Sequence, residues 1–160
     1  MARKKKKKKL GDELFEDNRK AHFDFQILEE FEAGIALHGS EVKSIRDGKI
    51  SLKEAYCQFT KDELFLLQAH ISEFTQAHAR NHLPLRARKL LLHRRELDRL
   101  DQSVRREGLT VIPLAVYLQN RHIKLKIALA RGKKTHDKRA SIKEREQKRE
   151  VQRAIRDGGR

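Results

Sequence analysis

The chain has 160 residues, a formal net charge of +15 at pH 7 and a single cysteine. This length fits one domain with extensions, and one cysteine excludes an internal disulfide and a multi-cysteine zinc site. No apolar run approaches the roughly 20 residues of a membrane span, and no apolar segment follows the N-terminal lysines as in a signal peptide. We therefore expect a soluble protein of a reducing, cytoplasmic compartment.

The positive charge is concentrated at the two ends of the chain. Residues 1–20 contain nine Lys and Arg against four acids, residues 131–160 contain twelve against five, and the body between them is nearly balanced. This distribution favours a polyanionic partner, with nucleic acid ahead of an anionic membrane surface. We expect residues 1–17 to be a disordered basic extension in the free chain. The run from Arg3 to Lys9 could be a nuclear address, a nucleic-acid arm or a solvated tail.

The first predicted elements are a strand and a short helix. Apolar and polar residues alternate over 23–27 and the phase shifts at 28–30, which predicts a strand with a β-bulge. Ser40 is the predicted N-cap of a seven-residue helix, and Gly48 supplies the left-handed position that ends it. Glycines before this helix suggest the sharp corners of a small barrel, although an ordinary strand-to-helix connection would show the same pattern.

A hairpin, a long loop and a second helix follow. Residues 55–60 alternate and are joined by a two-residue turn to 63–71, which predicts a β-hairpin with Cys57 buried on its apolar face. Residues 72–88 are polar and predict a long internal loop. Leucines and a valine at spacings of seven, three and four predict a helix from Lys89 to Arg106.

Two consecutive strands complete the predicted body. Residues 110–118 are apolar nearly throughout, which is typical of a strand buried on both faces. After a turn at 119–122, apolar residues alternate with Lys124, Lys126 and two alanines. Lysines beside small alanines would let a phosphate backbone approach closely, although lysine also simply keeps a strand face soluble. About six antiparallel strands and two inserted helices predict a mainly β protein, a small closed antiparallel barrel.

The C-terminal segment 132–160 is a basic tail with few apolar residues. Residues 140–156 lack glycine and proline and carry opposite charges four apart, which favours a helix but leaves little to dock on the body. We therefore expect a tail that folds on a polyanionic partner through contacts that weaken steeply with salt. His136 could stack on an exposed base, or it is an ordinary surface histidine.

No catalytic or metal constellation stands out in the sequence. His78 and His82 have ligand-like spacing, but no cysteine or carboxylate set completes a site around them. There is no phosphate-cradling P-loop and no nucleophile elbow. We therefore predict that the protein is not an enzyme and that it needs no metal and no cofactor.

Six segments occur in the order and at the spacing of one family: Glu32–Leu37, Gly39–Ser44, Lys89–Leu92, Glu107–Thr110, Gly132–Lys134 and Asp137–Arg139. Through them, roughly residues 18 to 156 resemble the SsrA-binding proteins (small protein B), the bacterial partners of transfer-messenger RNA. The resemblance implies an OB-like barrel over residues 18–131 with two to three inserted helices, followed by the tail over 132–160. The chain departs from the family's usual residues at His22-Phe23, Phe25 and Leu83.

The resemblance also implies a function in ribosome rescue. Members bind the tRNA-like domain of transfer-messenger RNA and carry it, with elongation factor Tu, to ribosomes stalled on broken messages; we expect a monomer. The implied RNA-binding surface comprises Asn18, Arg19, Lys20, Glu32 and Leu91, to which the strand alternation adds Lys124 and Lys126. The implied tail contacts, in the decoding site and the empty messenger channel, involve Gly132, Lys133, Lys134, His136, Asp137, Lys138 and Arg139.

Two other classes of function fit the same charge distribution. One is a general RNA-binding structural protein with basic extensions, which competition against bulk tRNA would distinguish because an electrostatic binder shows no preference. The other is a nuclease that uses the histidines, which incubation of RNA with and without a chelator would reveal.

Overall fold

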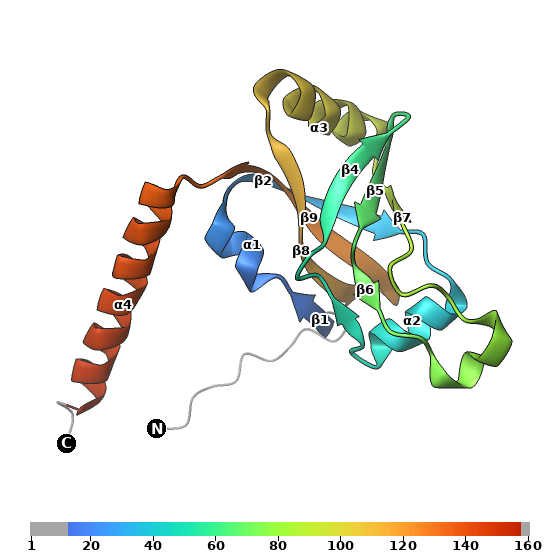
Figure 1. Cartoon of the computed structure of the whole chain (residues 1–160), viewed down its shortest axis with the longest axis horizontal. Coiled ribbons are helices and arrows are strands. Elements are labelled where there is room, and N and C mark those ends of the chain that lie inside the picture. The colour runs from blue at the N-terminus through green and yellow to red at the C-terminus, as the bar shows by residue number, and fades with distance from the viewer. Residues whose placement is uncertain (1–12, 158–160) are drawn as a thin grey trace.

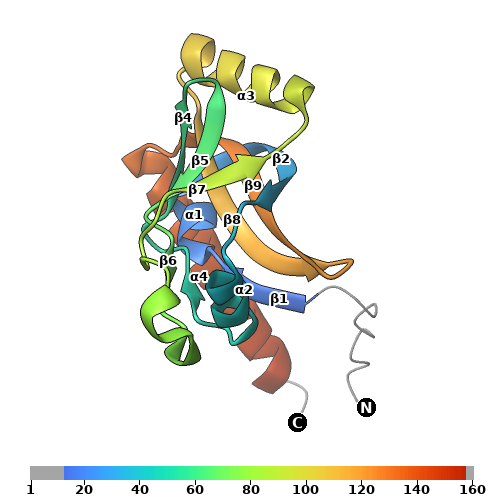
Figure 2. The same cartoon turned by 90° about the vertical axis from the view of Figure 1, so that its right-hand side faces the viewer.

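The computed structural model describes residues 13–157 of the chain. In this range the elements are, in order, β1 (Glu13–Asp17), α1 (Arg19–Asp24), β2 (Phe25–Ile35), α2 (Gly39–Arg46), β3 (Ile50–Ser51), β4 (Tyr56–Thr60), β5 (Glu63–Leu67), β6 (His70–Ile71), the 3-10 helix η1 (Thr75–Arg80), β7 (Arg88–Leu91), α3 (Arg94–Glu107), β8 (Thr110–Gln119), β9 (His122–Gly132) and α4 (Thr135–Asp157). The strands form a central body, α3 and α2 lie at opposite ends of it, and α4 projects away on the side of α1 (Figures 1 and 2).

Antiparallel pairing connects seven of these strands into one sheet. The strand order is β1-β8-β4-β5-β7-β2-β9, and β8 pairs with β9 as well. One edge of β8 is shared by β4, at Val111, and by β1, which pairs with residues 115–118. The short strands β3 and β6 form a separate two-stranded sheet. The structure therefore confirms a mainly β, antiparallel class with few helices.

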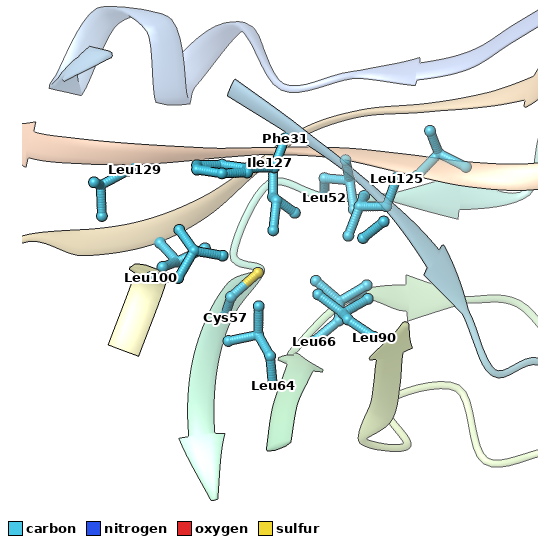
Figure 3. Close-up of a cluster of buried hydrophobic side chains, with 14 of the residues drawn as sticks. Phe31, Leu52, Cys57, Leu64, Leu66, Leu90, Leu100, Leu125, Ile127 and Leu129 are labelled. Carbon is cyan, nitrogen blue, oxygen red and sulfur yellow. The ribbon is translucent and has the colours of Figure 1, made fainter. Parts of the chain in front are cut away.

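The main hydrophobic core fills the space between the strands and α3 (Figure 3). Its fully buried members include Leu64 on β5, Leu100 on α3 and Leu125 and Ile127 on β9. These β9 residues lie on the face that the sequence pattern predicts to be buried. Cys57 points into the same cluster with 9% of its surface exposed, and burial raises the pKa of its thiol far above the ordinary value, which keeps it inert.

The opposite face of β9 is covered at one end. Ala128 and Ala130 are completely buried against Ala21 of α1 and the β8 residues Ile112 and Leu114. Of the two alternatives for this strand face, close approach of a phosphate backbone over the alanines is therefore excluded at this end of β9. Alternation identifies which residues share a face of a strand, but it does not show how far along that face a helix extends.

The predicted second helix begins five residues too early. Residues 88–91 form β7, which pairs with β5 and β2, and α3 begins only at Arg94. Three consecutive leucines at 90–92 satisfy a helical period and a strand equally well, and the completely buried Leu90 belongs to the strand. At the other end of α3, Gly108 adopts the left-handed conformation (φ +64°), as its position predicts.

The N-cap of the short helix is His38, not Ser40. The Glu41 carboxylate accepts a hydrogen bond of 2.7 Å from the backbone N–H of His38, in the manner of a capping box. The Ser40 hydroxyl instead lies 2.9 Å from Nδ1 of the buried His82. Gly48 takes the expected left-handed conformation (φ +73°) just after the helix.

The two ends of the body differ from the expectation. Residues 13–17 form β1, so they do not belong to a disordered extension, whereas the lysine run lies outside the described residues. The tail forms the continuous helix α4, and Lys138 near its start lies 3.0 Å from Asp24 of α1. No helix within residues 13–157 is long and apolar enough to cross a membrane.

Candidate nucleic-acid interface

A groove of about 630 Å³ lies between α2, the start of α3 and the adjoining ends of β2, β7 and β9; we call it the sheet groove. Its apolar lining comes from Gly34, Ile35, Leu37, Val42, Leu91, Leu92 and Ile123. Its polar lining comes from Glu32, Arg46, His93, Glu96, Arg121, His122 and Lys124. Glu32, Leu91 and Lys124, which the sequence analysis assigns to RNA binding from three separate segments, are thus brought together.

The register of three strands explains this convergence. Gly34 on the central strand β2 pairs with Leu91 of β7 on one side and with Lys124 of β9 on the other. A Cβ atom at Gly34 would lie 3.3 Å from the Cβ of Leu91, which is closer than most real contacts. Glycine therefore allows the Leu91 side chain to lie close against β2, while Leu91 remains 52% exposed.

Opposite charges alternate across the neighbouring strands. Lys124 Nζ lies 3.5 Å from Glu32 Oε1, and Lys126 Nζ lies 3.3 Å from Glu30 Oε2. The Tyr117 hydroxyl donates a hydrogen bond of 2.5 Å to the other oxygen of Glu32. Lys126 lines a second groove, of about 470 Å³, which shares Glu32 with the sheet groove. Both lysines are partly exposed and carry a partner, so a phosphate has to compete with a carboxylate for them.

The predicted residues at α1 do not join the sheet groove. Phe25, the first residue of β2 after α1, precedes Glu32 by seven positions, roughly 23 Å along an extended strand. The side chains of Arg19 and Lys20 are 92% and 59% exposed, and they lie 3.8 Å from Asp17 and 3.3 Å from Glu54. They form a second cationic position at the far end of β2.

Asn18 has a different role from its two neighbours, because it is buried. Its Oδ1 accepts a hydrogen bond of 3.1 Å from the backbone N–H of Ala21, which caps α1. Its Nδ2 donates to the carbonyl oxygens of Pro113 at 3.0 Å and Leu52 at 3.3 Å. Asn18 therefore fixes α1 on the body and offers little surface to a ligand.

The base of α4 rests on α1. The Lys133 backbone N–H donates to the carbonyl of Asp24 at 2.9 Å, and Lys138 Nζ lies 3.0 Å from the carboxylate of the same residue. The Arg145 guanidinium lies 5.8 Å from the ring centroid of Phe23, within the range of a cation–π contact. Two of the predicted tail residues, Lys133 and Lys138, thus contact the body.

We call the C-terminal tail from residue 132 onward the arm, and most of its described residues are exposed to solvent. Gly132 ends β9, where it pairs with Phe25, and Lys134, Asp137 and Arg139 expose their side chains. His136 belongs to the first turn of α4, and its side chain lies outside the described part of the structure. The arm therefore offers a further exposed cationic surface, in residues that do not line the sheet groove.

The segment Gly39–Ser44 contributes buried polar side chains to the interior of the body. Glu41 is completely buried, with Arg86 and Arg88 bonded to its carboxylate at 2.7 and 2.8 Å. Burial acts to raise the pKa of Glu41, but hydrogen bonds from Arg86, His38 and Arg88 outweigh it and hold the pKa below its usual range. No local pattern in the sequence connects Glu41 with arginines more than forty positions away.

Sequence reasoning also missed Tyr117, Arg46 and Arg121. An aromatic residue two positions before polar Gln119, in an otherwise apolar strand, is a signal that could have identified Tyr117. His82 is buried, and its Nε2 lies 3.0 Å from the carbonyl of Ile71. Among residues 13–157, no group of three or more His, Cys, Asp or Glu side chains is placed to hold a metal ion.

A mainly β body with a groove partly lined by cations, together with an exposed basic helix, is typical of a nucleic-acid-binding protein. The family model described as SmpB protein matches residues 15–157. The chain is 51% identical over 146 residues to an SsrA-binding protein of Acaryochloris marina, covering 91% of this chain and 95% of the relative. It is 46% identical over 160 residues to an SsrA-binding protein of Azorhizobium caulinodans, covering 99% and 100%.

A solved structure described as "tmRNA-SmpB: a journey to the center of the bacterial ribosome" contains a similar chain. The TM-score is 0.62 at 45% sequence identity, over 75% of this chain and 85% of that one. The chain belongs to the SmpB family. This membership confirms the predicted family and the prediction that the protein is not an enzyme.

Proposed function

We propose that the chain binds transfer-messenger RNA, the SsrA RNA, and delivers it to stalled ribosomes for rescue and tagging of incomplete proteins. The convergence of Glu32, Leu91 and Lys124 in the sheet groove is the observation that carries this proposal. Relatives named SsrA-binding protein and a neighbour described as tmRNA-SmpB support it. We propose further that the protein acts as a cytoplasmic monomer and meets elongation factor Tu through the RNA.

The lining of the sheet groove suits a folded RNA. Exposed Leu91 gives a base an apolar surface, Arg46, Arg121 and Lys124 can bind phosphates, and Glu32 can accept hydrogen bonds from a base or a 2′-hydroxyl. Arg19 and Lys20 would contact the same RNA at the other end of β2. Two contact regions separated by roughly 23 Å favour recognition of a tertiary shape over a short linear sequence.

The body supports this function as a closed, OB-like barrel over residues 18–131. Pairing runs from β8 through β4, β5, β7 and β2 to β9, and the β8–β9 pairing returns it to β8. A closed sheet has no free ends there, so the relative positions of the strands that line the groove are fixed. In this proposal β1 is an added strand on the rim of the barrel.

The arm, residues 132–160, is proposed to occupy the decoding site and the empty messenger channel as a helix. The first turns, from Gly132 to Arg139, would lie in the decoding site, with His136 near its bases. The exposed cations of α4 support this proposal, because they can neutralise the phosphates that surround a helix in an RNA channel.

Competition binding tests the proposal. The full chain is titrated with the tRNA-like domain of transfer-messenger RNA in the presence of excess bulk tRNA, at several salt concentrations. We expect retained binding to the tRNA-like domain and a weaker salt dependence than for bulk tRNA. Equal affinities with equal salt slopes would instead indicate a general electrostatic RNA binder.

A further inference from the structure

A buried network of three charged side chains joins α2 to β7; we call Glu41, Arg86 and Arg88 the charge network. Arg88 Nε donates to Glu41 Oε1 at 2.8 Å, and Arg86 Nη2 donates to Glu41 Oε2 at 2.7 Å. Glu41 and Arg88 have no exposed surface. Arg86, 29% exposed, also donates to the carbonyl of Ala36 at 3.1 Å and so connects the end of β2.

Arg88 connects the charge network to further segments of the chain. Its guanidinium donates to the carbonyl oxygens of Ala69 at 2.7 Å, Arg86 at 2.9 Å and Pro84 at 3.1 Å. Both Glu41 and Arg88 therefore have further hydrogen-bond partners besides each other. Together they hold α2, the loop before β7 and the segment after β5 in one arrangement. The planar guanidinium of Arg88 donates in several fixed directions, so its hydrogen bonds specify orientation as well as distance.

The charge network belongs to the same two elements, α2 and β7, that supply walls of the sheet groove. On α2, Val42 and Arg46 line the groove, one and five positions after Glu41. On β7, Leu91 lines it three positions after Arg88. Since α2 has only eight residues, tertiary contacts must decide where it lies.

We propose that Glu41 and Arg88 are positioning residues that set the spacing of the α2 and β7 walls of the sheet groove, and thereby its affinity for RNA. The inference rests on the proposed function of that groove. A buried ion pair adds little stability relative to apolar side chains of the same volume, so stability alone does not account for charges here. Their directional bonds place two groove walls that share no backbone hydrogen bonds.

Removal of the Glu41 charge separates positioning from electrostatics. Glu41→Gln takes one negative charge away from a protein that binds a polyanion, so charge alone predicts stronger binding. Positioning predicts weaker binding. Glu63→Gln is the matched control, because it also removes one acid, from a partly exposed pair with Lys89 next to Arg88. This control should bind RNA as well as the unchanged chain or slightly better.

Affinity for the tRNA-like domain is measured for each full-length variant over a range of salt. We expect Glu41→Gln to lose about tenfold in affinity, with an unchanged slope of log affinity against log salt, because no phosphate contact is lost. An affinity equal to or higher than that of the unchanged chain would overturn the proposal. Failure of the unchanged chain to prefer this RNA would instead overturn the proposed function.

A second variant covers the case in which Glu41→Gln does not fold, since it leaves Arg88 buried without a charged partner. The double change Glu41→Met with Arg88→Met replaces the pair by apolar side chains of similar length and should keep the urea midpoint near that of the unchanged chain. We expect it to show the same loss of RNA affinity. Arg86→Gln, at the exposed edge of the network, should show a smaller loss. Full affinity in these folded variants would contradict the positioning role.

Discussion

The body and the arm use the same charged residue types in opposite ways. In the body, Arg88 and Glu41 are inaccessible to water and bonded to several segments. In the arm, Lys138 reaches Asp24 across a contact in which both side chains remain partly exposed. Salt screens exposed pairs far more than buried ones, so the body keeps its shape under conditions in which the arm can exchange partners. Buried charges specify geometry, and exposed charges adjust affinity.

Removal of the arm should give the largest effect and tests this division most directly. Deletion of residues 133–160, which leaves β9 complete, should abolish tagging on stalled ribosomes but leave affinity for the tRNA-like domain nearly intact. Ala140→Pro is a matched variant that keeps every charge and costs the helix about 3 kcal/mol. If RNA affinity falls in proportion to the lost charge, the body and the arm do not divide the two functions.

Removal of the buried carboxylate should give the next largest effect, on stability. Glu41→Gln should lower the free energy of unfolding at pH 7 by about 3–5 kcal/mol, because Arg88 is left without its partner. The folded state lowers the pKa of Glu41, so its contribution is present above the ordinary value of 4.5 and is lost as pH falls through the folded pKa. The urea midpoints of Glu41→Gln and of the unchanged chain should therefore converge in acid. A difference that is independent of pH would contradict the assignment.

A single cation of the sheet groove should have an intermediate effect. Lys124→Ala removes one phosphate contact, so RNA affinity should fall and the salt slope should decrease by about one unit. Lys148→Ala is a control on the exposed face of α4, where the lysine pairs with Glu144 in the same helix. Binding titrations at several salt concentrations measure both. An unchanged slope for Lys124→Ala would place the phosphates elsewhere on the body.

A change at the base of the arm, where Lys138 pairs with Asp24, should have the smallest effect. Asp24→Asn removes the partner of Lys138, a partly exposed pair that contributes about 0.2–1 kcal/mol. Energy transfer between labels on the body and on α4 should therefore show a slightly less docked arm at low salt and no difference at high salt. Glu144→Gln, which leaves the base intact, should not change the transfer. A rigid arm that responds to neither change would mean that α4 is held by other contacts.

Sequence patterns predicted strands better than they predicted what covers them. The alternation along β9 identified Leu125 and Ile127 as core residues, but burial of Ala128 beneath α1 depends on a helix one hundred positions earlier. The leucines at 90–92 misplaced the start of α3 because a short apolar run has no unique period. The family resemblance pointed to Glu32 and Leu91, and the strand alternation pointed to Lys124. Only the register around Gly34 shows that the three share one groove.

The reactivity of the Cys57 thiol can report how often the body opens. Cys57 is the one thiol of the chain, and it lies within the core next to the strands that would have to separate if the sheet opened. A thiol reagent modifies the thiolate and therefore reaches it only in molecules that are transiently open. The rate of modification thus reports how often the interior is exposed, with no introduced label. Closed molecules cannot be joined to each other by oxidation through this position.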